Sequence, residues 1–115
     1  MARHLLMAFS NPLEGLEDEF NRWYNEVHLD DVLKVPGYIS AQRFELSPTQ
    51  MVPGAPYRYV ALYEVETDDL EATSNTLQLM PQEQLPVSDS WDYERCATWW
   101  FTPITEQVAE NPRSD

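Results

Sequence analysis

The sequence predicts a single α+β domain whose elements follow the order strand, helix, strand, strand, helix, strand. Four short apolar and aromatic runs are typical of strands, two longer segments carry apolar residues at helical spacing, and turns containing proline or glycine separate them. A chain of this order folds into a four-stranded antiparallel sheet with both helices on one face. Because 115 residues suffice for one core only, we expect residues 1–104 to form the domain and residues 105–115 a mobile arm.

The first half of the chain contains one expected strand and the clearest helix. Residues 3–10 include a continuous apolar run, which is typical of a strand buried on both faces. Residues 16–29 begin with three acids, which stabilise a helix N-terminus, and Pro36 with Gly37 ends the segment. The apolar stripe of this helix is expected to comprise Leu16, Phe20, Trp23 and Val27.

The second half of the chain contains two expected strands, a helix and a last strand. Residues 38–46 and 57–65 are rich in residues suited to a pleated sheet and flank a proline-rich loop, so we expect them to pair antiparallel. The second helix begins after Thr67 or Asp68, either of which can cap it, and a proline ends it. Residues 93–102 are expected to form the last strand.

Large apolar residues on both faces of the sheet predict a homodimer. Trp99 and Trp100 are consecutive in the last strand, so their side chains point to opposite faces. In the first strand Leu5, Met7 and Phe9 alternate with His4, Leu6 and Ala8, so both of its faces are largely apolar as well. Two helices cover one face only, and the other would expose a larger apolar patch than monomers usually tolerate. A second copy packed sheet to sheet would bury that patch.

Composition limits the partners and the compartment. The net charge of −13 argues against nucleic acid or an anionic membrane as a partner, because both would repel the protein. Cys96 is the single cysteine, so no intrachain disulfide can form, which fits a reducing compartment. The apolar run near the N-terminus is too short for a signal peptide or a membrane span. We therefore expect a cytoplasmic protein.

The first helix and the strands after it resemble a known family. The stretches that carry the resemblance are Phe20–His28, Asp31–Gly37, Ser40–Phe44 and Tyr59–Glu64. They resemble the EthD-like proteins of the dimeric α/β-barrel superfamily, with one departure at Asp30, where such sequences often have a proline. The resemblance implies a ferredoxin-like protomer and a dimeric α/β barrel formed sheet to sheet. Relatives include cofactor-free cyclases, isomerases and monooxygenases as well as haem-degrading enzymes, so the shared fold does not transfer one reaction.

Tyr24, His28 and Asp31 form the candidate catalytic group. Their spacing of four and three places them along one ridge of the helix. Histidine titrates near neutral pH, and a carboxylate can fix its tautomer and stabilise the imidazolium. We expect His28 to be the base and Tyr24, Tyr59 or Tyr63 to donate a hydrogen bond to an enolate oxygen. The alternative is a structural His28 that caps a carbonyl or bonds a neighbouring carboxylate.

A flat hydrophobic or aromatic ligand is expected between the helices and the sheet. Tyr57, Tyr59 and Tyr63 should share one strand face around the small Ala61, which would form a concavity rimmed by hydroxyls. An ordinary aromatic core explains the same pattern equally well. The residues expected to contact the ligand are Phe9, Asn11, Trp23, Tyr59, Tyr63 and Trp100.

Three other features have structural interpretations. Arg43 can pair with Glu64 across neighbouring strands, with anion binding as its second use. Asn21 and Asn25 lie off the apolar stripe and should face solvent. Trp91 lies in a long loop, where it could serve as a lid.

No cofactor and no metal are expected. The two histidines, His4 and His28, and the lone cysteine match no zinc or iron spacing, and three glycines provide no phosphate-binding loop. The haem-degrading relatives use an asparagine of the first strand, a tryptophan and a histidine of the second helix. Asn11 is suitably placed for the first of these, but the second helix here contains no histidine, so haem is rejected.

These features favour a cofactor-independent enzyme that moves a proton on a small hydrophobic carbonyl compound. A lyase, cyclase or isomerase fits better than a hydrolase, because no nucleophile is evident. Two alternatives stay open, a non-catalytic small-molecule carrier or accessory protein and a cofactor-free monooxygenase.

Overall fold

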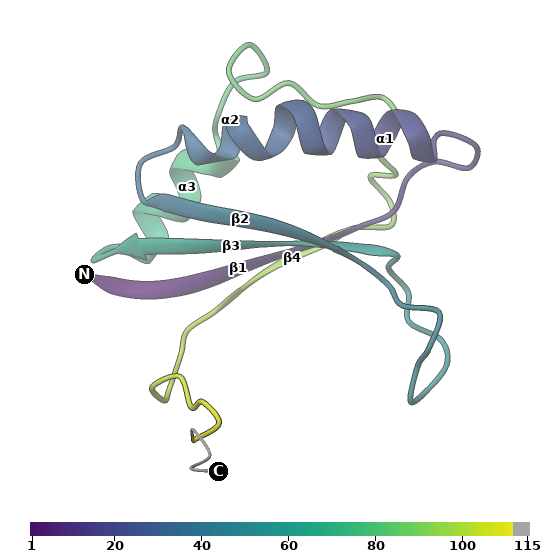
Figure 1. Ribbon diagram of the computed structural model, residues 1–115. Helices are drawn as coiled ribbons and strands as arrows, with labels where there is room; N and C mark the ends of the chain where they lie inside the picture. The colour runs from purple at the N-terminus through teal and green to yellow at the C-terminus, as the bar shows by residue number, and fades with distance from the viewer. Residues whose placement is uncertain (112–115) are drawn as a thin grey trace.

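A computed structural model of the chain describes residues 1–111. Its sheet has the strand order β2-β3-β1-β4 with antiparallel neighbours, and the helices lie on one face of it (Figure 1). The predicted α+β architecture is thus confirmed. The elements are β1 (Ala2–Ser10), α1 (Glu17–Trp23), η1 (Tyr24–His28), α2 (Leu29–Leu33), β2 (Tyr38–Glu45), β3 (Tyr59–Thr67), α3 (Leu70–Gln78) and β4 (Ala97–Phe101).

The core lies between the sheet and the long helix. Alternate residues of the two central strands are buried toward the helices, because successive strand side chains point to opposite faces. The register sets Leu6 opposite Tyr63 and Ala8 opposite Ala61, so small and large side chains alternate below the helix. The buried apolar residues are Leu6, Ala8, Phe20, Tyr24, Val32, Val35, Tyr38, Tyr59, Ala61, Tyr63 and Val65.

The long helix differs from the prediction in length and in its buried face. It runs without a break from α1 through the π-helical turn η1 into α2, ending at Leu33 instead of near residue 29. Phe20, Tyr24, His28 and Val32, spaced by four, are all buried. In a regular α-helix four residues overshoot one turn by about 40°, so such a row would drift around the helix. The wider π-turn takes up that excess and keeps the row facing the sheet.

The π-turn also explains why the predicted stripe was partly wrong. Val27, expected in the core, is 38% exposed, whereas Tyr24 and His28 take the buried positions. After the helix, Gly37 turns the chain with a φ of +96°, and its backbone passes so close to β3 that an added Cβ would lie 3.0 Å from the Glu66 carbonyl oxygen.

The second helix, α3, begins one residue later than predicted. The Asp69 side chain caps it by accepting a hydrogen bond from the Ala72 amide at 3.0 Å. Thr67 instead accepts a hydrogen bond from the Asp69 amide, so it stabilises the turn before the helix. Leu77 and Met80 pack against the core, although α3 has no fully buried residue.

A long segment, residues 79–96, joins α3 to β4 and runs along the outside of α1 and α2 (Figure 1). It contains no strand at residues 93–96, so β4 is shorter than predicted. The segment is fastened to the end of β1 by a bridge between Pro12 and Trp91 and by a hydrogen bond of 2.7 Å from the Leu13 amide to the Ser90 carbonyl. This attachment places the Trp91 side chain against the long helix.

The sheet face opposite the helices is apolar and open. The Phe9 ring lies 5.6 Å from the Trp99 ring on this face, while Trp100 points the other way and donates a hydrogen bond to Ser74 of α3. The predicted division of the two tryptophans between the faces is confirmed. The expected arm from residue 105 has no regular structure as far as residue 111, and residues 112–115 lie outside the described part. No helix among residues 1–111 is long and apolar enough to cross a membrane.

Candidate functional site

An aromatic cluster surrounds His28 between the long helix and the sheet. Its imidazole centre lies 4.6 Å from the Trp23 ring and 4.9 Å from the Tyr24 ring, which it meets edge-on. Trp91, from the segment 79–96, closes another side at 6.0 Å. The long helix therefore supplies three of the four rings, and a bridge to β1 fixes the fourth. The sequence suggests Trp91 only as a possible lid, because its position here depends on a contact that no local pattern shows.

His28 is held as a neutral imidazole. It is 6% exposed, and its buried Nδ1 has no hydrogen-bond partner. Burial lowers the pKa of His28 from 6.5 to about 4, because the charged form loses its hydration. Asp31 raises this pKa and Arg43 lowers it, both by smaller amounts. At neutral pH the ring is therefore uncharged, and one of its two nitrogens can accept a proton.

Asp31 contributes to the site through its charge. The side chain is mostly buried, and its carboxylate lies 3.4 Å from the Lys34 ammonium group one turn away. No hydrogen bond joins it to His28 among the described residues, so the structure does not show the predicted fixing of the tautomer. Its negative charge would nevertheless stabilise an imidazolium at His28.

Two buried tyrosines provide hydrogen-bond donors. Tyr24 and Tyr63 are each about 2% exposed or less, and their phenols interact, although the Tyr63 hydroxyl makes no hydrogen bond of normal geometry. Burial raises the pKa of Tyr24 and of Tyr63, and for Tyr63 the neighbouring Tyr24 phenol raises it further. Both phenols therefore stay protonated at physiological pH and can donate to an oxyanion.

Arg43 of β2 lies on the other side of Tyr24. Its Cζ is 4.3 Å from the Tyr24 ring centre, within the range of a cation–π contact. The guanidinium donates hydrogen bonds to the side-chain oxygens of Asn25, at 2.8 Å, and Asn21, at 3.0 Å. The predicted ion pair of Arg43 with Glu64 is wrong, because Arg43 points toward the helix and Glu64 pairs with Arg3 on the open face. The expectation that both asparagines face only solvent is wrong for the same reason.

The other expected ligand contacts fall into two groups. Tyr59 lies on the covered face, where its ring packs 5.9 Å from that of Phe20 and its hydroxyl accepts a hydrogen bond of 3.2 Å from Asn21, and Trp100 lies on the same face. Phe9 lies on the open face and does not meet the others. Tyr57 precedes β3 and packs 5.5 Å from Phe9, so the prediction that it shares the face of Tyr59 and Tyr63 is wrong.

The hydrogen-bonding groups of the Asn11 side chain are used within the protein. It is 2% exposed, and its amide group donates to the carbonyl oxygens of Pro56, at 2.9 Å, and Arg95, at 3.3 Å. Its side-chain oxygen accepts the Arg58 amide at 2.9 Å. These bonds tie two loops to the end of β1 and occupy the groups that a ligand would need.

Several buried polar atoms on the helix side of the sheet, including one of His28, have no hydrogen-bond partner among the described residues. Besides His28 Nδ1 and the Tyr63 hydroxyl, they are the indole nitrogens of Trp23 and Trp91, the Arg43 Nε and the Ser10 hydroxyl. Buried polar groups are nearly always bonded, and one left without a partner costs about 1–3 kcal/mol. The hydroxyls, the indole nitrogens and the Arg43 Nε each carry a hydrogen to donate, so these atoms favour a ligand that presents hydrogen-bond acceptors.

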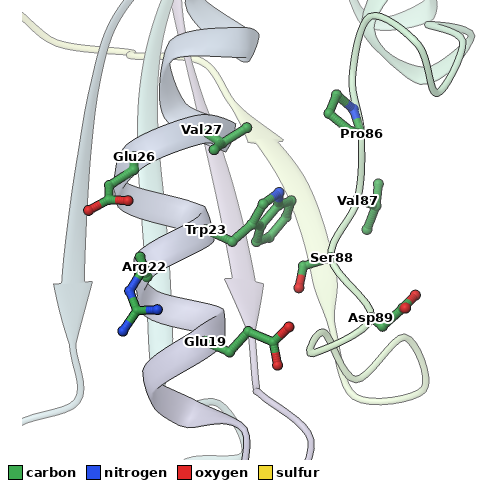
Figure 2. Close-up of a pocket in the computed structure, with 9 residues that line it drawn as sticks. All are labelled: Glu19, Arg22, Trp23, Glu26, Val27, Pro86, Val87, Ser88 and Asp89. Carbon is green, nitrogen blue, oxygen red and sulfur yellow. The ribbon is translucent and has the colours of Figure 1, made fainter.

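Two grooves run along the outer side of the long helix beneath the segment 79–96. One, of about 440 Å³, has the Trp23 indole as part of its wall, and the other, of about 680 Å³, is lined in part by Asp31. They share Val27 and Pro86. Figure 2 shows Trp23 and Glu19 reaching from the helix toward the loop residues Pro86–Asp89. His28 lines neither groove, because it lies behind Trp23.

The strand order, the two helices on one face and the buried cluster between them define a ferredoxin-like fold. This is the architecture of the dimeric α/β-barrel proteins. The sequence itself matches no family model and no curated protein.

Solved structures share this fold at low sequence identity. MhuD, a haem degrader of Mycobacterium tuberculosis solved with two haems in its active site, is 12% identical with a TM-score of 0.64, over 91% of this chain and 99% of that one. A dimeric ferredoxin-like protein from Jannaschia is 14% identical, with a TM-score of 0.60 over 88% and 99%. An EthD family protein from Bacillus halodurans is 11% identical, with a TM-score of 0.52 over 90% and 100%.

Other matches include two provisionally assigned monooxygenases, from Shewanella loihica and Bacillus cereus. The expected fold is therefore confirmed, together with the likeness to EthD-like proteins. All these identities are too low to carry a reaction from one protein to another.

The residues present do not fit a haem or a metal ion. His28 is enclosed by three aromatic rings and so offers no axial ligand to a porphyrin, and the Nδ1 of His4 on β1 already lies 2.9 Å from the Thr102 hydroxyl oxygen. α3 contains no histidine. Residues 1–111 also contain no group of three or more His, Cys, Asp or Glu side chains that could hold a metal ion.

Proposed function

We propose that this protein binds a small aromatic carbonyl compound at the His28 cluster and transfers a proton on it without a cofactor. The observation that carries the proposal is a buried, neutral imidazole with an unpartnered nitrogen, surrounded by rings and by donors that lack acceptors. Aromatic walls suit a flat ligand, and unpartnered donors suit its carbonyl oxygens.

The residues divide the chemistry between them. His28 accepts a proton from the carbon next to the carbonyl, and the negative charge moves onto the carbonyl oxygen. Tyr63 or Tyr24 donates a hydrogen bond to that oxygen, and the positive field of Arg43 favours the enolate. Asp31 stabilises the imidazolium that forms, which offsets part of the penalty that burial places on its charge. Return of the proton to another carbon completes an isomerisation, and loss of a leaving group completes a lyase reaction.

Access to His28 runs through Trp23. The ligand enters the 440 Å³ groove against the exposed side of the indole, and rotation of Trp23 or Trp91 brings it to the imidazole. The open face of the sheet supports a further part of the proposal, that the working form is a homodimer joined through this face. An apolar face without cover on a protein of net charge −13 favours a second copy over an anionic partner.

Deuterium exchange tests the proton transfer directly. The probe is 2-tetralone, an aromatic ketone with acidic α-hydrogens, incubated with the protein in deuterated water and followed by proton NMR. We expect exchange to fall at least about 100-fold in His28→Gln, because general base catalysis contributes roughly 10²–10⁴-fold. His4→Gln is the matched control, since it removes the other histidine, and it should keep the full rate. Equal rates for His28→Gln and the native chain would refute the proposal.

A non-catalytic carrier is the second candidate, favoured by one observation. Both grooves lie outside the long helix, and His28 lines neither of them. A carrier predicts saturable quenching of tryptophan fluorescence by 2-tetralone with no exchange above the background rate. Oxygen uptake with an anthrone as substrate would point instead to a cofactor-free monooxygenase.

A further inference from the structure

Arg43 is a cation without a carboxylate partner in a chain dominated by acids. The sequence has 20 Asp and Glu against seven Lys and Arg, and the ion pairs of the described residues involve Arg3, Lys34 and Arg58. Arg43 forms none of them, although it is more buried than any of those three. Removing a charge from water without pairing it is costly, so the absence of a carboxylate here has to be compensated.

The asparagine contacts compensate only part of that cost. A guanidinium has five N–H donors, and two of them donate to Asn21 and Asn25. The buried Nε has no acceptor. Both acceptors are neutral amides, which bind a cation more weakly than a carboxylate does. The guanidinium thus keeps its net positive charge and free donors.

The position of Arg43 links the surface to the His28 cluster. Its bond to Asn25 is exposed and its bond to Asn21 is partly buried, so the guanidinium spans the edge between α1 and β2. The Tyr24 ring centre lies 4.3 Å from its Cζ on one side and 4.9 Å from the His28 ring centre on the other. A charged group at Arg43 is therefore one aromatic ring away from the proposed base.

We propose that Arg43 anchors the ligand by an acidic group, so that the compound bound beside His28 is an aromatic carboxylate. This rests on the proposed function, since it names the class of compound that the same site takes. A carboxylate accepts two parallel N–H bonds from a guanidinium, and the flanking Tyr24, Tyr59 and Phe20 rings would pack against the aromatic body. The enolate formed next to it would experience the same positive charge.

A matched pair of probes tests the anchor, namely 1-hydroxy-2-naphthoate and its neutral amide, 1-hydroxy-2-naphthamide. Their dissociation constants are measured by calorimetry with the full chain. We expect the naphthoate to bind at least about tenfold more tightly, because a charge-assisted hydrogen bond contributes more than a neutral one. Arg43→Gln should remove that preference and leave the affinity for the amide within about twofold. Arg58→Gln, which removes an equal charge from an exposed ion pair, should keep it.

Asn25→Asp separates anchoring from folding. It keeps an acceptor for the Arg43 Nη1 while placing a carboxylate beside the guanidinium, so the contact between helix and strand is preserved. If Arg43 serves the ligand, this variant loses the preference for the naphthoate as Arg43→Gln does. If Arg43 only joins α1 to β2, the preference is unchanged and the proposal is overturned. Asn75→Asp, on the exposed side of α3, controls for the added negative charge.

The outcomes distinguish the two proposals. Equal affinity of the native chain for both probes, with exchange of 2-tetralone still dependent on His28, would overturn the anchor and leave the proton transfer intact. Equal losses in Arg43→Gln and Arg58→Gln would also overturn it, since the effect would then be one of overall charge. Binding of neither probe, together with no exchange, would overturn both.

Discussion

The two faces of the sheet differ in what they leave unsatisfied. The covered face buries polar atoms that have no hydrogen-bond partner, among them those of His28, Tyr63 and Arg43. The open face exposes apolar side chains, with Trp99 and Phe101 each 51% exposed. Unpartnered donors favour a ligand that presents acceptors and uncovered apolar surface favours a protein partner, because hydrogen bonds are directional and hydrophobic burial is not. The same sheet therefore points to a small molecule on one side and a second copy on the other.

The largest expected effect is on the homodimer proposed to form through the open face. Trp99→Glu places a charge at the centre of the proposed interface, and we expect the dimer dissociation constant to rise about 1,000-fold, as at a buried interface anchor. Sedimentation velocity at micromolar concentration should show one chain in place of two. Leu79→Glu, at an 81% exposed site beyond α3, is the control and should stay dimeric. A native chain that sediments as a monomer would contradict the proposed homodimer.

The pH dependence of stability tests the covered face. Below pH 6.5 the unfolded chain protonates His28, whereas the folded protein does so only near its lowered pKa of about 4. Stability is therefore complete above pH 6.5 and falls by about 3 kcal/mol as the pH decreases through that window. Urea unfolding should show this slope in the native chain and in His4→Gln, and a reduced slope in His28→Gln. An unchanged slope in His28→Gln would mean that the imidazole is not held neutral.

Two buried tyrosines allow a hydroxyl that has a hydrogen-bond partner to be compared with one that has none, through the change in unfolding free energy when each is removed. Tyr38 donates a hydrogen bond of 3.0 Å to the Thr73 carbonyl, so Tyr38→Phe should destabilise the protein by about 1 kcal/mol. The Tyr63 hydroxyl has no partner, so Tyr63→Phe should leave stability unchanged or raise it by up to about 1 kcal/mol. The same variant should slow the exchange of 2-tetralone. Equal destabilisation in both variants would show that Tyr63 has a structural bond.

The smallest expected effect on stability concerns Trp100, which follows Trp99 in β4 but points to the other face. Ser74→Ala removes the acceptor of the 3.0 Å bond from the Trp100 indole, and we expect a loss of about 0.5–1 kcal/mol in unfolding free energy. Because Trp100 faces the helices, the dimer dissociation constant should not change. A shift in sedimentation with this variant would mean that the two faces are coupled.

The sequence by itself determined the order of the elements and the two-faced apolar sheet. These follow from local periodicity, since alternation along a strand and the spacing of apolar residues in a helix depend on backbone geometry alone. The neighbourhood of Tyr24 and His28 was visible for the same reason, because residues four apart on a helix are always close.

Only the tertiary structure decided which face of the long helix is buried and which side chains complete the site. The π-turn holds His28 toward the sheet, Trp91 arrives from a segment more than 60 residues away along the chain, and Arg43 pairs with asparagines across the helix–sheet contact. No local sequence pattern predicts these three features. Each depends on packing between elements that are far apart in the sequence, and such contacts leave no periodic pattern of apolar residues. Tyr57 shows the same limit, since alternation predicts a face only within the strand, and β3 begins at Tyr59.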